Sequence, residues 1–231
     1  MQLRALVCAI LICLNMTPAQ AWEAVGSGSL VELYTSEGCS SCPPADAWLS
    51  ALRNRPGLWR DFVPAAFHVD YWDGLGWPDK FAVPAFTQRQ RTYASLWKTS
   101  TIFTPAIIIQ GENSGAVTQI SAVKQSLKAT WNTNEMVITS ALTGATVNVA
   151  WLAMDVVTDV KRGENAGSKL RHDFIVLKHQ VLGPHEATKK WPLTQPTGTA
   201  APVKALVVWL EVRQRPVVAA GGYLKSDLNS P

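Results

Sequence analysis

The sequence predicts an α/β fold in which a domain built on a parallel βαβ unit is followed by a β-rich, sandwich-like C-terminal region. Two β-rich runs flank a short amphipathic helix near the N-terminus, and the later segments are mostly β-branched runs separated by turns. Of the 231 residues, 47% are hydrophobic and only 16% are charged. This composition excludes a disordered tail, a collagen-like repeat and a coiled coil.

The first 21 residues have the pattern of a secretory signal peptide. Arg4 gives a positive start, residues 5–14 form an apolar run, and Ala19 to Ala21 fit a small-residue cleavage site. We therefore expect a secreted or periplasmic protein after cleavage near Ala21. The apolar run is shorter than the ~20 residues that span a bilayer, so we do not expect an integral membrane protein.

A βαβ unit is predicted over about forty residues, the usual length of a right-handed parallel crossover. Residues 29–35 form the first strand and residues 62–69 the second. Between them, apolar residues recur at helical spacing until Pro56-Gly57 ends the helix: Ala45, Trp48, Leu49 and Leu52. A parallel sheet follows from this order.

The next segments complete the first domain. We expect an aromatic-rich loop over 71–84 and a helix over 85–97. A buried strand over 106–109, a turn over 111–115 and a partner strand over 116–118 would then form a hairpin. Ile120, Val123 and Leu127 mark the face of a last helix, which closes near Trp131.

Beyond residue 132 the sequence consists mainly of short β-branched runs, without a helical pattern. The expected strands are 136–140, 146–151, 154–160, 174–182, 203–212 and 216–222. Their roughly even spacing favours an antiparallel sheet or a small sandwich. We therefore expect a signal peptide over 1–21, a first domain over 22–131 and a β-rich domain over 132–231.

Two of the four cysteines remain once the leader is removed, namely Cys39 and Cys42. A bridge between them would close too short a loop to stabilise the chain much by entropy. A Cys-x-x-Cys after a strand and at the mouth of a helix favours a thiolate instead. We expect Cys39 to attack a disulfide and Cys42 to resolve the mixed disulfide.

Thr104-Pro105 stands directly before the buried strand at 106–109. An X-Pro bond can be cis and can expose the preceding backbone to an extended substrate. Together with the βαβ unit and the cysteine pair, this arrangement resembles the thioredoxin fold over about residues 29–131. The resemblance implies that Thr104 and Pro105 face the substrate.

Four stretches also resemble the signatures of a secreted, thioredoxin-like family known as a domain of unknown function, number twelve twenty-three. They are VELYTSEGCSSCPPAD, FHVDYWDGLGW, FTPAIIIQG and RGENAG. The resemblance spans nearly the whole mature chain and implies a fold but no substrate. Unlike redox thioredoxins, this chain has Ser40-Ser41 rather than Gly-Pro between its cysteines.

Several ionisable side chains are expected near the sulfurs because the carboxyl ends of parallel strands meet at one edge of a sheet. They are Glu32, Glu37, His68, Asp70 and Asp73. Glu32, His68 and Asp70 are candidates for acid–base or orienting roles. The alternatives are a structural carboxylate for Glu32, a core histidine for His68 and a turn cap for Asp70.

Aromatic and histidine side chains complete the candidates. Trp72 and Trp77 are expected to bind substrate, the alternative being that they cover the core between the domains. The segment 162–167 is expected to join two strands of a hairpin and is assigned no catalysis. His172, His179 and His185 show no ligand spacing with the cysteines, so no metal site is expected.

Three functions are compatible with this pattern. The first is an exported thiol-disulfide oxidoreductase that acts on thiols or disulfides of exported proteins and uses no cofactor besides its own redox-active disulfide. The second is a non-catalytic binding protein on the same scaffold. The third is a Cu(I)-handling module that uses Cys39, Cys42 and His68. A formal net charge of +4 without a dense basic run gives no indication of nucleic-acid binding.

Overall fold

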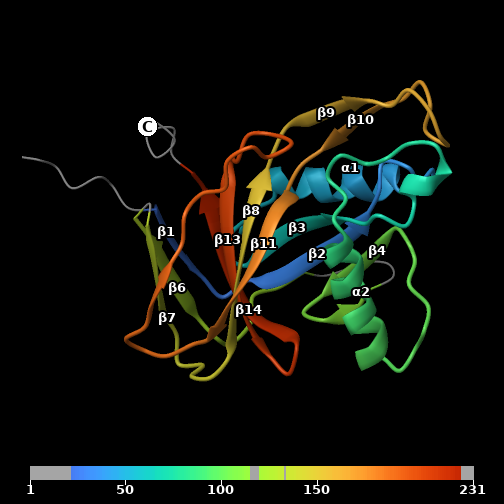
Figure 1. The fold of residues 1–231 in the computed structure, drawn as a ribbon. Helices are drawn as coiled ribbons and strands as arrows, with labels where there is room; N and C mark the ends of the chain where they lie inside the picture. Colours follow the sequence, from blue (N-terminus) through green and yellow to red (C-terminus); the bar gives the residue numbers. More distant parts are fainter. Residues whose placement is uncertain (1–21, 115–119, 133, 225–231) are drawn as a thin grey trace, which may run out of the picture.

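The computed structural model describes residues 22–114, 120–132 and 134–224. The expected signal peptide and the expected strand at 116–118 lie outside these residues. The described part is an α/β protein dominated by sheets (Figure 1). An eight-stranded sheet has the order β14-β13-β8-β11-β3-β2-β4-β5, a four-stranded sheet has the order β1-β6-β7-β12, and β9 pairs with β10 in a separate hairpin.

The elements have the following bounds: β1 (Trp22–Gly26), β2 (Ser29–Thr35), α1 (Pro43–Ala51), η1 (Leu52–Asn54), β3 (Phe62–His68), η2 (Asp73–Leu75), α2 (Pro84–Leu96), β4 (Ala106–Ile109), β5 (Glu112–Asn113), β6 (Leu127–Trp131), β7 (Glu135–Thr139), β8 (Thr146–Ala153), β9 (Val156–Asp159), β10 (Lys169–His172), β11 (Ile175–Pro184), β12 (Lys190–Pro192), β13 (Ala205–Val212) and β14 (Arg215–Tyr223).

The predicted βαβ unit is confirmed by β2, α1 and β3. The two strands are parallel and in register from Ser29 opposite Phe62 to Thr35 opposite His68. On the other side of β2, strand β4 runs antiparallel and continues into β5. The turn between β4 and β5 consists of Gln110 and Gly111, so it is shorter than the turn expected over 111–115. These two residues have φ values of 52° and 76°. Two successive left-handed residues are the requirement of a type I′ hairpin turn.

Strands from both sides of residues 131–135 share the large sheet. β11 lies parallel to β3, with Ile175 opposite Ala66, and antiparallel to β8. β8 in turn pairs with β13, and β13 pairs with β14. The expected division of the chain therefore does not coincide with a break in this sheet.

The helix expected between residue 120 and Trp131 is wrong, because Leu127–Trp131 is strand β6. Its side chains alternate: Leu127, Ala129 and Trp131 are buried, whereas Lys128 is exposed. β6 pairs with β1 on one side and β7 on the other. The spacing of Ile120, Val123 and Leu127 suits a helix, but pairing with the distant β1 and with the neighbouring β7 decided the conformation.

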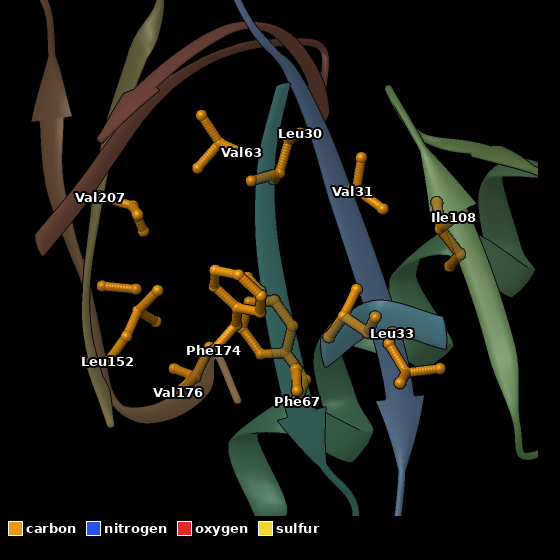
Figure 2. Packing of buried hydrophobic residues seen from close by; sticks show 14 of the residues in the cluster. Leu30, Val31, Leu33, Val63, Phe67, Ile108, Leu152, Phe174, Val176 and Val207 are labelled. Carbon is orange, nitrogen blue, oxygen red and sulfur yellow. The ribbon is translucent and has the colours of Figure 1, made fainter. Parts of the chain in front are cut away.

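The core joins the two halves of the chain. In Figure 2, Leu152, Phe174 and Val207 approach the βαβ unit from the C-terminal strands, opposite Val63 and Phe67. A second cluster, which contains Trp131 and Trp151, packs between the two larger sheets. Within the residues that the structure describes, no helix is long and apolar enough to cross a membrane.

Candidate active site

Cys39 and Cys42 form a disulfide where the chain passes from β2 into α1. Cys42 is the residue before the helix, and Pro43 and Pro44 occupy its first two positions. Prolines are tolerated there because those backbone N–H groups would have no partner within the helix. Cys39 lies in the preceding loop, where its N–H donates to the carbonyl oxygen of Ser36 at 3.1 Å.

Both cysteines are 0% exposed, although Ser40 and Ser41 between them are exposed. The exposed serines place the loop at the surface with the bridge on its inner side. Reaction at either sulfur therefore requires a local movement of the protein.

The β9–β10 hairpin contacts the cysteine loop. Figure 1 shows this hairpin beyond the ends of β8 and β11, alongside α1. Asn165, in the connection between its strands, donates from Nδ2 to the carbonyl oxygens of Glu37 at 2.9 Å and Cys39 at 3.0 Å. Glu164 Oε2 accepts from the N–H of Ser40 at 3.2 Å. The hairpin connection is confirmed, and it also fixes the backbone of the cysteine loop.

A buried group of ionisable side chains lies on the α1 side of β2, next to the cysteine loop. We call it the cysteine-side cluster: Glu37, Asp46, His68, Asp79 and His172. Asp79 Oδ2 is 2.7 Å from His68 Nδ1 and accepts from the N–H of Glu37 at 2.8 Å. His172 lies between two carboxylates, with Nε2 3.6 Å from Glu37 Oε1 and Nδ1 3.9 Å from Asp46 Oδ1. These last distances are too long for hydrogen bonds, so the attraction is one between charges.

The charges of this cluster depend on one another. Burial by itself would lower the pKa of His172, but Asp46 and Glu37 outweigh it and raise that pKa to about 9. Burial would raise the pKa of Asp79, but His68 outweighs it and lowers that pKa to about 2. Burial also opposes ionisation of Glu37, yet the nearby His172 and the hydrogen bond from Trp77 hold its pKa below the usual value. His172 is thus a buried cation at neutral pH.

Hydrogen bonding in the cysteine-side cluster is incomplete. Within the described part of the chain, four of its buried atoms have no hydrogen-bond partner: Glu37 Oε1, His68 Nε2, and Nδ1 and Nε2 of His172. Buried polar atoms are nearly always paired in native proteins, so each exception needs a reason. Their concentration beside a disulfide makes this cluster the strongest candidate for function in the described residues.

Glu32 belongs to the opposite face of β2. Its carboxylate accepts from Arg89 Nε at 2.7 Å and from the hydroxyl of Tyr93 at 2.5 Å, and both of these residues lie on α2. Thr35, three residues later, bonds instead to Asp46 on α1. Because side chains alternate along a strand, Glu32 points away from the cysteine side. Its contacts fit the structural alternative.

Asp70 also makes structural contacts. Its Oδ1 accepts a hydrogen bond at 2.5 Å from the hydroxyl of Thr87, a residue in the first turn of α2. The same hydroxyl accepts from the N–H of Asp70 at 3.3 Å. These two hydrogen bonds hold the chain that follows β3 against α2. They fit the alternative that Asp70 caps a turn.

The predicted substrate-binding residues are brought together near the cysteine loop. The Thr104–Pro105 bond is cis, as the sequence suggested. Trp72 donates from Nε1 to Thr104 Oγ1 at 2.7 Å, and its Cβ lies against Gly38, where an added methyl group would come within 3.1 Å. Trp77 donates to Glu37 Oε2 at 2.8 Å. Both tryptophans are partly exposed, so substrate contact at these residues stays a prediction.

A pocket of about 390 Å³ separates α1 from β10. It is lined by Pro43, Asp46, Ala47, Ser50, Lys169, Leu170, Arg171 and His172. Because Asp46 and His172 line it, the pocket reaches from the solvent to the cysteine-side cluster. Pro43, which also lines it, directly follows Cys42. A larger pocket of about 610 Å³ is lined mainly by 80–83 and 194–200 and contains none of the cluster residues.

Among residues 22–114, 120–132 and 134–224, no group of three or more His, Cys, Asp or Glu side chains is arranged to hold a metal ion. Binding of Cu(I) by Cys39, Cys42 and His68 would need the disulfide to be reduced. In this structure His68 Nδ1 faces Asp79 instead. The copper hypothesis stays a prediction.

Sequence reasoning found the cysteines, Glu37 and His68 but missed the partners that complete the site. These are Asp46, Asp79, Glu164, Asn165 and His172. The sequence offered two signals: polar residues among the glycines of RGENAG, and the pair His172-Asp173 before a buried strand. Neither signal shows that these residues meet the cysteine loop.

The fold and site define an α/β protein with a buried disulfide at the start of a helix and a cluster of buried ionisable groups next to the cysteine loop. The chain belongs to the family described as protein of unknown function (DUF1223), which matches residues 30–211. This confirms the family that the sequence was found to resemble.

Two solved structures resemble the chain in fold. One is the crystal structure of protein AGR_C_4864 from Agrobacterium tumefaciens, with 22% identity and a TM-score of 0.57, covering 85% of this chain and 93% of that one. The other is HBP35 of Porphyromonas gingivalis, with 11% identity and a TM-score of 0.51, covering 85% of this chain and 75% of that one. No curated protein matches significantly.

Proposed function

We propose that the protein is an exported thiol-disulfide oxidoreductase that works through Cys39 and Cys42. The observation that carries this proposal is the position of the disulfide, between a central parallel strand and the first turn of α1, beside a cluster of incompletely paired ionisable groups. Such positions favour thiolates and shifted pKa values. Export follows from the expected signal peptide at 1–21.

A thioredoxin-like architecture for the first half of the chain is part of this proposal. The order β2-α1-β3, then α2 and the β4–β5 hairpin, is the order by which the sequence resembles thioredoxin. The expected last helix of that pattern is replaced by strand β6.

In the reaction, the reduced Cys39 thiolate attacks a disulfide of an exported protein. One substrate sulfur leaves as a thiolate, and Cys39 is joined to the other in a mixed disulfide. Cys42 then attacks Cys39, which forms the Cys39–Cys42 disulfide and releases the second substrate thiolate. The substrate gains two electrons and the protein loses two; the reverse sequence oxidises a substrate dithiol.

Access to the buried sulfurs requires the cysteine loop to open. The contacts of Asn165 and Glu164 with this loop are hydrogen bonds between side chains and backbone. Each of the two Asn165 bonds contributes only about 1 kcal/mol, and the Glu164 bond is exposed to solvent. Movement of the 162–167 connection would remove them and leave the sheet intact. A substrate segment would then lie between Trp72, Trp77 and the Thr104–Pro105 segment.

Two cysteine variants test the proposal. Cys39→Ser should abolish exchange with a disulfide-bonded peptide, whereas Cys42→Ser should accumulate a mixed disulfide between Cys39 and the peptide, visible by mass spectrometry. Equal behaviour of the two variants would reject the assigned roles. The reduction potential of the couple would then place the protein among oxidants, reductants or inert bridges.

Burial of both sulfurs favours a second candidate, a non-catalytic binding protein whose disulfide is a local structural bridge. This candidate predicts a very low reduction potential and a folded protein whose disulfide resists both glutathione and a small dithiol. Exchange by the folded wild-type protein at a measurable rate would exclude it.

A further inference from the structure

We propose that His172 is a positioning residue for the cysteine pair, whose positive charge stabilises the thiolate formed at Cys42 when the disulfide opens. This inference rests on the proposed exchange at Cys39 and Cys42. It assigns a part of that chemistry to β10, a strand more than a hundred residues further along the chain.

Asp46 and Pro43 link His172 to the Cys42 end of the cysteine loop. Asp46 lies one helical turn after Cys42, and its N–H donates to the Cys42 carbonyl oxygen at 3.1 Å. The Asp46 carboxylate faces His172, and both residues line the pocket that begins at Pro43. His172 is 2% exposed, so water screens its charge only weakly.

The groups that face His172 explain why its charge matters. Glu37 approaches from the loop after β2, Asp46 from α1, and the ring of His68 from β3 with its centroid 5.1 Å away. Asp79 lies behind His68. The two exposed cations of β10 face other partners, since Lys169 pairs with Asp159 and Arg171 with Asp155.

Without His172, the carboxylates of Glu37 and Asp46 would remain beside the cysteine loop without the cation that lies between them. Like charges held together in a buried site disfavour ionisation, so the pKa of the thiol would rise. With His172 present, one positive charge lies between Glu37 and Asp46 and offsets their effect. His172 keeps this charge at neutral pH because both neighbours favour its protonated form.

The incomplete hydrogen bonding of His172 supports the same inference. A histidine that served only the core would be expected to bond through at least one ring nitrogen. The fully buried His185, for comparison, lies 3.2 Å from the carbonyl oxygen of Ile138 through Nε2. His172 instead faces carboxylates at both nitrogens and the solvent-reaching pocket.

The test isolates one thiol. In the full chain with Cys8, Cys13 and Cys39 each replaced by serine, Cys42 is the remaining cysteine, and its ionisation is followed by thiolate ultraviolet absorbance against pH. Adding His172→Gln should raise the thiol pKa by about one unit, which lowers the thiolate fraction at neutral pH about tenfold. His185→Gln, a matched buried histidine, should leave the titration unchanged. Identical curves with and without His172 would overturn the inference.

A reciprocal measurement keeps the test decisive if His172→Gln unfolds the chain. A cation that stabilises the Cys42 thiolate is itself stabilised by that thiolate, so the NMR titration of the His172 ring in the single-thiol chain should shift to lower pH when Cys42 is also replaced by serine. An unchanged His172 titration would contradict the inference. Because neither titration requires disulfide exchange, both test His172 separately, whereas failure of the wild-type protein to exchange would reject the proposed function.

Discussion

Two buried ionic clusters lie on opposite faces of β2 and differ in how completely they are paired. On the α2 face, Arg89 donates to Glu32 at 2.7 Å, to Tyr93 at 2.9 Å and to Glu211 at 2.8 Å. Tyr34 and Tyr93 donate to Glu32 as well. We call this group the Glu32–Arg89 cluster. On the α1 face, four atoms of the cysteine-side cluster have no hydrogen-bond partner among residues 22–114, 120–132 and 134–224.

The difference shows what each cluster is suited to do. Buried charges are costly unless their partners satisfy them, and the Glu32–Arg89 cluster meets this condition. It can hold α2 against the sheet and needs no other role. The cysteine-side cluster leaves buried groups unpaired at a cost in stability, which is typical of sites shaped by chemistry.

The largest expected effect comes from breaking the paired cluster. Arg89→Ala leaves the carboxylate of Glu32 buried without its cation, and we expect a loss of about 3–5 kcal/mol in the free energy of unfolding, measured by urea denaturation. Arg91→Ala, an exposed position on the same helix, is the matched control and should change little. A loss below about 1 kcal/mol for Arg89→Ala would mean that the two clusters do not differ as described.

The second prediction concerns the dependence of stability on pH. The pKa of His172 is raised to about 9 in the folded protein from an ordinary value of 6.5. Its contribution to stability is therefore fully present below about pH 6.5 and is lost as the pH rises through 9. Linkage gives a contribution of about 3 kcal/mol.

Urea denaturation of the wild-type protein and of His172→Gln across this window measures that contribution. The wild-type protein should lose stability between pH 6.5 and 9 relative to the variant. Parallel curves would show that His172 is not held as a cation between Glu37 and Asp46.

The smallest expected effect is kinetic. Asn165→Ala removes two hydrogen bonds to the cysteine loop, at the Glu37 and Cys39 carbonyl oxygens, and should speed reduction of the folded disulfide by dithiothreitol about tenfold. Asn148→Ala is the control, because Asn148 is a buried asparagine bonded to His179. Equal acceleration by both variants would indicate that the substitutions destabilise the protein in general, and not that Asn165 specifically holds the cysteine loop closed.

The elements around the cysteines were predictable because their signals are local. β-rich runs marked β2 and β3, helical spacing marked α1, and Pro56-Gly57 marked the end of the helical segment. The error at β6 has a different origin, since the distant β1 forms one side of the ladder that made Leu127–Trp131 extended, with the neighbouring β7 on the other. The short edge strands β1 and β12 were missed because each pairs with a strand far along the chain.

By itself, the sequence determined the cysteine pair, the strand and helix that hold it, and the family to which the chain belongs. These depend on residues a few positions apart, whose periodicity and turn chemistry act over short range. The tertiary structure alone decided which ionisable groups surround the sulfurs, because Asn165 meets Glu37 across 128 positions of sequence. Pairing of β11 beside β3 brings the β9–β10 hairpin to the cysteine loop, and such sheet contacts depend on the whole core.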